Sequence, residues 1–165
     1  MNSQQLTFKD YFKSIQVIHF ALMTGVIFFA VIAYILVSQG FAVGGLENID
    51  NLLSAIVPVF LIAGLFSGNF LFKIKVNEAK EKPDLMEKFN LYRSALIIKL
   101  ALVEGPAFFS IVFYMLTGKF LYLVLTGFLL AVFYYYKPTR EKIIGDLELS
   151  SAERQIVEDP DGVIG

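Results

Sequence analysis

Four runs of apolar residues dominate the 165-residue sequence, and the polar residues gather between them. A helix needs about 20 apolar residues to cross the roughly 30 Å hydrocarbon core of a membrane. The runs at 15–37, 52–72 and 95–116 reach this length, and a fourth at 120–136 falls slightly short of it. The pattern predicts an all-α, polytopic membrane protein with four transmembrane helices at these positions.

Basic residues mark one side of the predicted bundle. Twelve of the 14 Lys and Arg residues precede the first run, lie between the second and third, or follow the fourth. The connection 38–51 has none of them and carries Glu47 and Asp50. Because cytoplasmic loops are enriched in Lys and Arg, we expect both termini to lie in the cytoplasm, with the chain in a bacterial-type cytoplasmic (inner) membrane.

The segments outside the spans also carry signals. Apolar residues in 6–15 recur near helical spacing, so the N-terminal segment 1–14 is either a short helix on the membrane surface or a plain polar tail. Pro83-Asp84 should break the polar segment between the second and third runs into two helical pieces. In the C-terminal tail 138–165, Ser150 and Glu153 form a capping-box pattern that predicts a short helix ending before Asp159.

Two further expectations concern segments outside the spans. Gly44-Gly45 in the connection 38–51 reads as a turn, and residues 162–165 are expected to fray.

Composition supports the membrane class and narrows the chemistry. The chain is 56% hydrophobic, with a mean hydropathy of +0.65 and 17 Phe. It has no Cys, which excludes disulfides and thiol catalysis, and one His leaves few ways to build a transition-metal site. No catalytic constellation is visible, so we expect no cofactor and no enzyme activity. Acidic residues interleave the basic ones between the second and third runs, which disfavours nucleic-acid binding.

Glu104 is the most unusual residue in the sequence. It lies about ten residues inside the third run, or about 15 Å deep at 1.5 Å per residue. An ionised carboxylate at mid-bilayer costs at least about 2.5 kcal/mol, so such a group usually faces other helices, finds a partner or stays protonated. Thr24 and Thr126 reach the same depth and could hydrogen-bond it. Glu104, Thr24 and Thr126 therefore form the candidate ion-binding site.

Small residues reach the same level on every predicted span, which suggests close packing there. Small side chains let helix backbones approach each other in lipid. Pro106 should in addition kink the third span around residues 102–105, and the freed backbone groups would lie beside Glu104. The candidate packing and kink residues are Gly25, Gly64, Gly68, Gly105, Pro106 and Gly127.

A second polar layer is predicted nearer the cytoplasm, at His19, Asn69 and Lys99. These residues lie about 4.5–7.5 Å inside their spans and could meet as a proton entry route. The alternative is that Lys99 snorkels to the interface and His19 makes an interfacial hydrogen bond.

The sequence contains the stretch Ala63-Gly-Leu-Phe-Ser-Gly68, the loop Lys82-Pro-Asp84 and the segment 95–107. Together these three parts resemble the hairpin of the rotary ATP synthase c subunit. The resemblance covers about residues 63–115. It implies that Glu104 corresponds to the ion-binding glutamate of that family, with reversible proton or sodium binding in an oligomeric ring. The first and fourth spans lie outside it.

Two hypotheses follow for function. In the first, the chain is an accessory or assembly subunit of a membrane complex, within a homo-oligomer or a larger assembly, and Glu104 holds helices together. In the second, it is a transport protein that handles protons or sodium through Glu104. A third hypothesis, a lipid or quinone site beside Gly64, Glu104 and Thr126, ranks behind both.

Overall fold

The computed structural model describes residues 6–41, 47–159 and 162–164, and within the second helix it describes the side chains from residue 55 onward. Its helices are α1 (Phe8–Ser38), α2 (Glu47–Lys80), α3 (Leu85–Thr117), α4 (Phe120–Tyr135), α5 (Arg140–Leu147) and α6 (Ser151–Glu158). The described residues contain no strand, only an isolated antiparallel bridge between Thr7 and Val163. The all-α prediction is confirmed.

Three helices are long and apolar enough to cross a membrane. They are α1, the part of α2 from Ala55 to Lys80, and α3. The 16-residue α4 is followed by α5 at an angle of 74°, and this bent pair makes up to a fourth crossing. The chain is therefore built as a multi-pass membrane protein.

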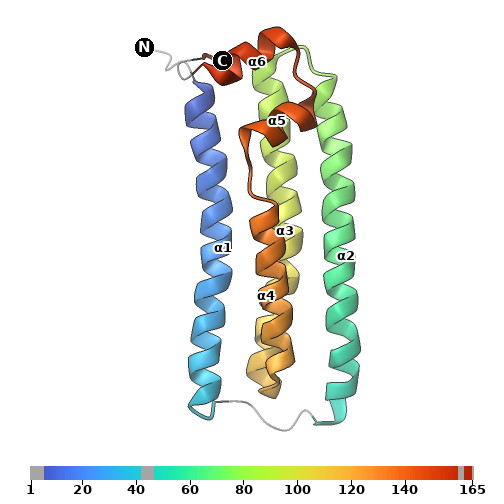
Figure 1. The fold of residues 1–165 in the computed structure, drawn as a ribbon. Coiled ribbons are helices and arrows are strands. Elements are labelled where there is room, and N and C mark those ends of the chain that lie inside the picture. Colours follow the sequence, from blue (N-terminus) through green and yellow to red (C-terminus); the bar gives the residue numbers. More distant parts are fainter. Residues whose placement is uncertain (1–5, 42–46, 160–161, 165) are drawn as a thin grey trace, which may run out of the picture.

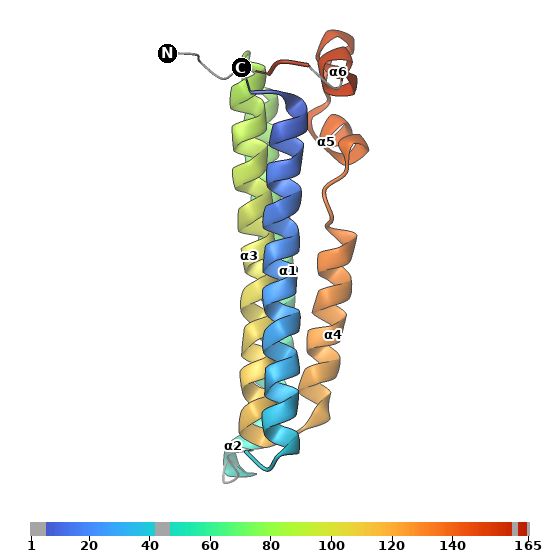
Figure 2. The same cartoon turned by 90° about the vertical axis from the view of Figure 1, so that its left-hand side faces the viewer.

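The long helices run side by side, with α3 at the centre (Figure 1). α1, α2 and α4 each pack against α3, while α1 also contacts α4 and α2 contacts α5. Figures 1 and 2 show the start of α1, the α2–α3 turn, α5 and α6 together at one end of the bundle, which we call the terminal end.

α1 differs from the predicted division into a surface segment and a span. It is one continuous helix from Phe8, capped by the Thr7 side chain, which accepts a hydrogen bond from the Asp10 backbone N–H. Phe8 and Tyr11 are buried against Phe89 of α3, and the Tyr11 hydroxyl donates to the Phe89 carbonyl at 2.8 Å. The periodic apolar residues therefore face another helix. Residues 1–5 of the predicted segment lie outside the described residues.

The α2–α3 connection is a short turn, as predicted from Pro83-Asp84. α2 ends at Lys80 and α3 begins at Leu85. The Asp84 carboxylate caps α3 by accepting from the Glu87 backbone N–H at 3.0 Å. At the other end of the bundle α2 begins at Glu47, so the connection between α1 and α2 is shorter than the predicted 38–51. The predicted Gly44-Gly45 turn lies outside the described residues.

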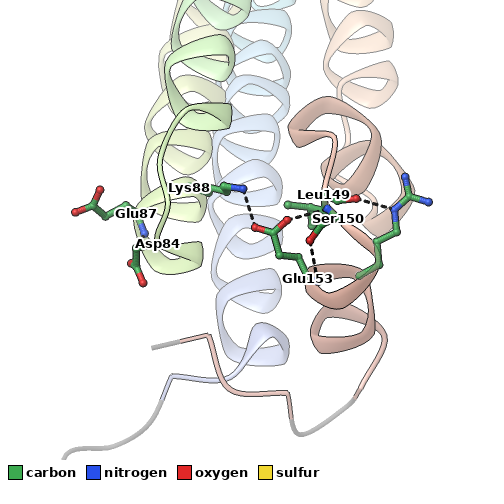
Figure 3. Close-up of polar contacts among 7 residues, drawn as sticks. Asp84, Glu87, Lys88, Leu149, Ser150 and Glu153 are labelled. Carbon is green, nitrogen blue, oxygen red and sulfur yellow. Dashed lines mark hydrogen bonds and ion pairs between the residues drawn. The ribbon is translucent and has the colours of Figure 1, made fainter.

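The C-terminal segment is a packed cap at the terminal end. α6 begins at the predicted capping box, in which both reciprocal hydrogen bonds between Ser150 and Glu153 are present. Lys88 of α3 donates to the Glu153 carboxylate at 2.7 Å, as Figure 3 shows. The cap buries Ile143, Leu147, Leu149, Val157 and Ile164.

The expectation that residues 162–165 fray is wrong for 162–164. The Ile164 N–H donates to the Leu6 carbonyl, and the Phe8 N–H donates to the Gly162 carbonyl. Gly162 and Ile164 are buried as a result. The backbone of this segment is held by the start of α1, which sequence periodicity does not reveal. Gly165 lies outside the described residues.

Candidate functional site

Glu104 lies half-buried on the side of α3 that faces α1. Phe108, one turn further along the same face, packs against Phe29 of α1 with ring centroids 5.4 Å apart. α1 and α3 run parallel, and Glu104 and Gly25 each lie four residues before this contact pair. Glu104 is therefore level with Gly25. Within the described residues, no hydrogen bond or ion pair reaches the Glu104 carboxylate. The group is therefore partly sheltered by its own chain, and the described residues supply it with no polar partner.

The two threonines do not complete the predicted pocket around Glu104. The buried Thr126 hydroxyl donates to the Tyr122 carbonyl of its own helix at 3.0 Å. Thr24 is exposed on α1. A hydroxyl in an apolar helix readily bonds the carbonyl four residues earlier, and that local bond competes with contacts between helices. The expected hydrogen bonds to Glu104 are absent in the described structure.

Gly64 lies at the closest approach of α2 and α3. A Cβ atom at this position would lie 2.5 Å from the Leu102 carbonyl oxygen and 2.8 Å from Cγ of Pro106. Pro106 has no N–H to donate to the Leu102 carbonyl, so this oxygen is left over from the α3 hydrogen-bond ladder. It faces Gly64 on α2, not Glu104, and α3 continues through Pro106 as one helix.

The remaining glycines divide into two groups. Gly68 also lies against α3, where an added Cβ would be 3.3 Å from the Lys99 carbonyl oxygen. At Gly25, Gly105 and Gly127 an added Cβ would meet nothing within 4 Å. The structure thus places Gly64 and Gly68 at a helix contact within the chain. Gly25, Gly105 and Gly127 make no such contact within the described chain, because equal depth does not put residues on facing surfaces.

One face of α3 is not covered by the described helices. Its residues recur at helical spacing and are exposed or half-exposed: Ser94, Ile97, Ala101, Gly105 and Val112. We call this set the open face of α3. It lies between the sides of α3 that contact α1 and α2 and points away from α4, and Glu104 lies along its edge.

A polar cavity of about 460 Å³ lies near the terminal end, where α2 and α3 meet the α4–α5 bend. Two residues of the predicted polar layer line it. Asn69 donates its side-chain amide to the Tyr136 hydroxyl at 2.7 Å, and the Lys99 ammonium lies 3.8 Å from the centroid of the Tyr136 ring. The Lys99 ammonium is also 4.4 Å from the Phe72 ring. Cations bind the faces of aromatic rings, so both rings hold Lys99 in place.

The opposite wall of this cavity carries its own polar contacts. The Tyr92 hydroxyl donates to the Asp146 carboxylate of α5 at 3.0 Å. Lys142 donates to the carbonyls of Tyr135 and Lys137, which are left without partners where α4 ends. The cavity is thus bounded by an ordered network from α2, α3, α4 and α5.

His19 does not join Asn69 and Lys99. It is 1% exposed on α1 and packs against Phe133 of α4, with ring centroids 6.2 Å apart. Neither ring nitrogen has a hydrogen-bond partner among the described residues. The predicted three-residue layer is therefore split between two helix interfaces.

Several cavity residues were not predicted from sequence: Phe72, Tyr92, Tyr136, Lys142 and Asp146. The Tyr-rich end of α4 could have pointed to this cavity, but a single sequence does not show which helices are neighbours.

The described residues contain no group of three or more His, Asp or Glu side chains placed to hold a metal ion. No protein-family model, no curated protein and no solved structure matches this chain. Function must therefore be inferred from the two polar features themselves.

Proposed function

We propose that this chain is an accessory or assembly subunit of a membrane complex, with Glu104 and the open face of α3 as its contact with a partner helix. The observation that carries this proposal is the Glu104 carboxyl group, which lies half-buried without a polar partner among the described residues. A carboxyl group at mid-bilayer is stable only if a neighbour, a proton or water compensates it. A partner helix that brings a hydrogen-bonding side chain to the open face would supply the missing contact.

The proposal includes a membrane arrangement. α4 forms the fourth crossing, and the terminal end lies in the cytoplasm of a bacterial-type cell. The distribution of basic residues supports this orientation. A short α4 reaches about 24 Å at 1.5 Å per residue, so the α4–α5 bend lies near the cytoplasmic interface.

Cross-linking tests the proposal directly, because the chain contains no cysteine. A single cysteine at Ala101 on the open face should give a cross-linked product in native membranes. A cysteine at Phe128, which is 53% exposed on α4, is the matched control and should give none. The Ala101 product should persist with Glu104→Gln, which keeps hydrogen bonding, and be lost with Glu104→Leu.

Two results would contradict assembly through Glu104. One is equal cross-linking from Ala101 and Phe128, and the other is an Ala101 product that Glu104→Leu leaves unchanged. The mass of the product separates a second copy of the chain from a different partner.

The second candidate function is proton or sodium handling at Glu104, which the resemblance to the c subunit also favours. A carboxyl group without a fixed partner can bind and release a proton as its surroundings change. Glu104→Gln distinguishes the two functions. It should abolish proton or sodium flux in proteoliposomes under the transport hypothesis, while assembly should remain intact under both.

A further inference from the structure

We propose that the cavity at the α4–α5 bend is a binding site for a phosphate-bearing anion, with Lys99 as its principal ligand. This site is separate from Glu104 and does not depend on the function proposed there. It is built from side chains of four helices that hold each other in position.

The cavity has an excess of hydrogen-bond donors on one wall. The Lys99 ammonium has three N–H groups, and within the described residues it contacts two aromatic rings but no hydrogen-bond acceptor. The Tyr136 hydroxyl accepts from Asn69, which leaves its own O–H to donate. An ammonium and a hydroxyl on one wall suit the oxygen atoms of an anion.

The other charged groups of the cavity already have partners. The Asp146 carboxylate accepts the Tyr92 hydroxyl, and the Lys142 ammonium is bonded to two backbone carbonyls. Asp146, Lys142 and Lys73 are the charged groups that act on Lys99, two of them positive. No salt bridge neutralises Lys99 in the part of the chain that the structure describes. Its charge remains available to a ligand.

The location and size of the cavity also suit such an anion. The cavity holds about 460 Å³, and one wall includes Tyr135, which is 74% exposed. A ligand can therefore enter from the surface. Lys99 lies about 7.5 Å inside the third predicted span, near the boundary between acyl chains and headgroups. Basic pockets between transmembrane helices on the cytoplasmic side of a membrane bind lipid headgroups, and the terminal end is proposed above to lie on that side. A phosphate in this cavity can come from an anionic lipid or from a soluble phosphate ester.

The test compares purified full-length protein in nanodiscs and in neutral detergent. Binding of phosphatidylglycerol is measured by native mass spectrometry against phosphatidylcholine as the neutral lipid. In parallel, inorganic phosphate and glycerol 3-phosphate are added to the protein in detergent, and the shift in thermal unfolding is recorded. Lys99→Met removes the charge and keeps an unbranched side chain. Lys13→Met is the control, because Lys13 is exposed on α1 at the same end and its loss changes the net charge equally.

We expect Lys99→Met to weaken binding at least about tenfold, the loss of one charge-assisted hydrogen bond, and Lys13→Met to leave it unchanged. Tyr136→Phe should also weaken binding, and it serves as the second variant if Lys99→Met does not fold. This pattern with phosphatidylglycerol identifies a lipid site, and the same pattern with the soluble probes identifies a soluble ligand. Equal loss in Lys99→Met and Lys13→Met, or no binding of any probe by the wild-type protein, would overturn the proposal.

Discussion

At Gly64 the space of a single methyl group decides how closely two helices approach. The Leu102 carbonyl oxygen occupies the position where a side chain would begin. Pro106 leaves that oxygen without its usual intrahelical donor, and a Cα–H group of glycine can approach it closely. The GxxxG pattern of Gly64 and Gly68 thus serves packing between α2 and α3, as its residue types suggested.

Substitution of Gly64 by Ala should destabilise the bundle, because the backbone carbonyl of Leu102 has little room to move. We expect a loss of about 1–3 kcal/mol in the free energy of unfolding, typical of overpacking. Gly127→Ala is the control, since an added Cβ there meets nothing within 4 Å. Equal thermal unfolding of the two variants in the same detergent would show that α2 and α3 are not this close.

His19 provides a second prediction at the scale of one residue. A buried polar group without a hydrogen bond costs about 1–3 kcal/mol. His19→Leu removes this cost at similar volume, so thermal unfolding should occur at higher temperature than in the wild type. His19→Asn keeps a buried polar group and should give no gain. A clear loss of stability in His19→Leu would instead reveal a bound partner for the imidazole.

Among the elements, α6 is tied to α3 by a charge pair. The Glu153 carboxylate accepts from the Lys88 ammonium at 2.7 Å and from the Ser150 N–H at 2.8 Å. Partial burial by itself raises the pKa of Glu153, but these donors outweigh it and hold the pKa below its usual value of 4.5. The carboxylate therefore fixes the start of α6 and also ties it to α3 (Figure 3).

The attachment of α6 should depend on pH in a defined direction. Because the folded-state pKa of Glu153 is lowered, its contribution is complete above the usual carboxyl value and is lost as the pH falls through the lowered pKa. Hydrogen exchange of the α6 amides should show protection at neutral pH that declines in acid. In Glu153→Gln the protection should already be weaker at neutral pH and nearly independent of pH. An identical acid response in both proteins would rule out this carboxylate as the cause.

Local sequence signals predicted the elements well. Apolar runs marked the long helices, Pro83-Asp84 marked the turn, and Ser150 with Glu153 marked the start of α6. Each of these signals acts within a few residues of chain. The continuation of α1 to Phe8 was missed because it depends on burial against Phe89, which is 81 residues away.

For the whole molecule, counting residues along the predicted spans gives an expected depth for each residue but no orientation around its helix. Glu104, Thr24 and Thr126 were expected at one depth, yet Thr24 is exposed and Thr126 bonds its own helix. Asn69 and Lys99 line one cavity, whereas His19 faces α4. Depth follows from counting residues, but the choice of neighbours depends on packing between distant segments. The candidate site was therefore predicted as a list of residues and only partly as an arrangement.

The central position of α3 has a consequence for biogenesis. α1 and α2 are made first, but each of them packs against α3. During synthesis α1 and α2 therefore lie in the lipid without their main contacts until α3 leaves the translocation machinery. Glu104 arrives with that third helix, so the carboxyl group enters the bilayer at the moment when the nascent chain first gains a framework on which to assemble.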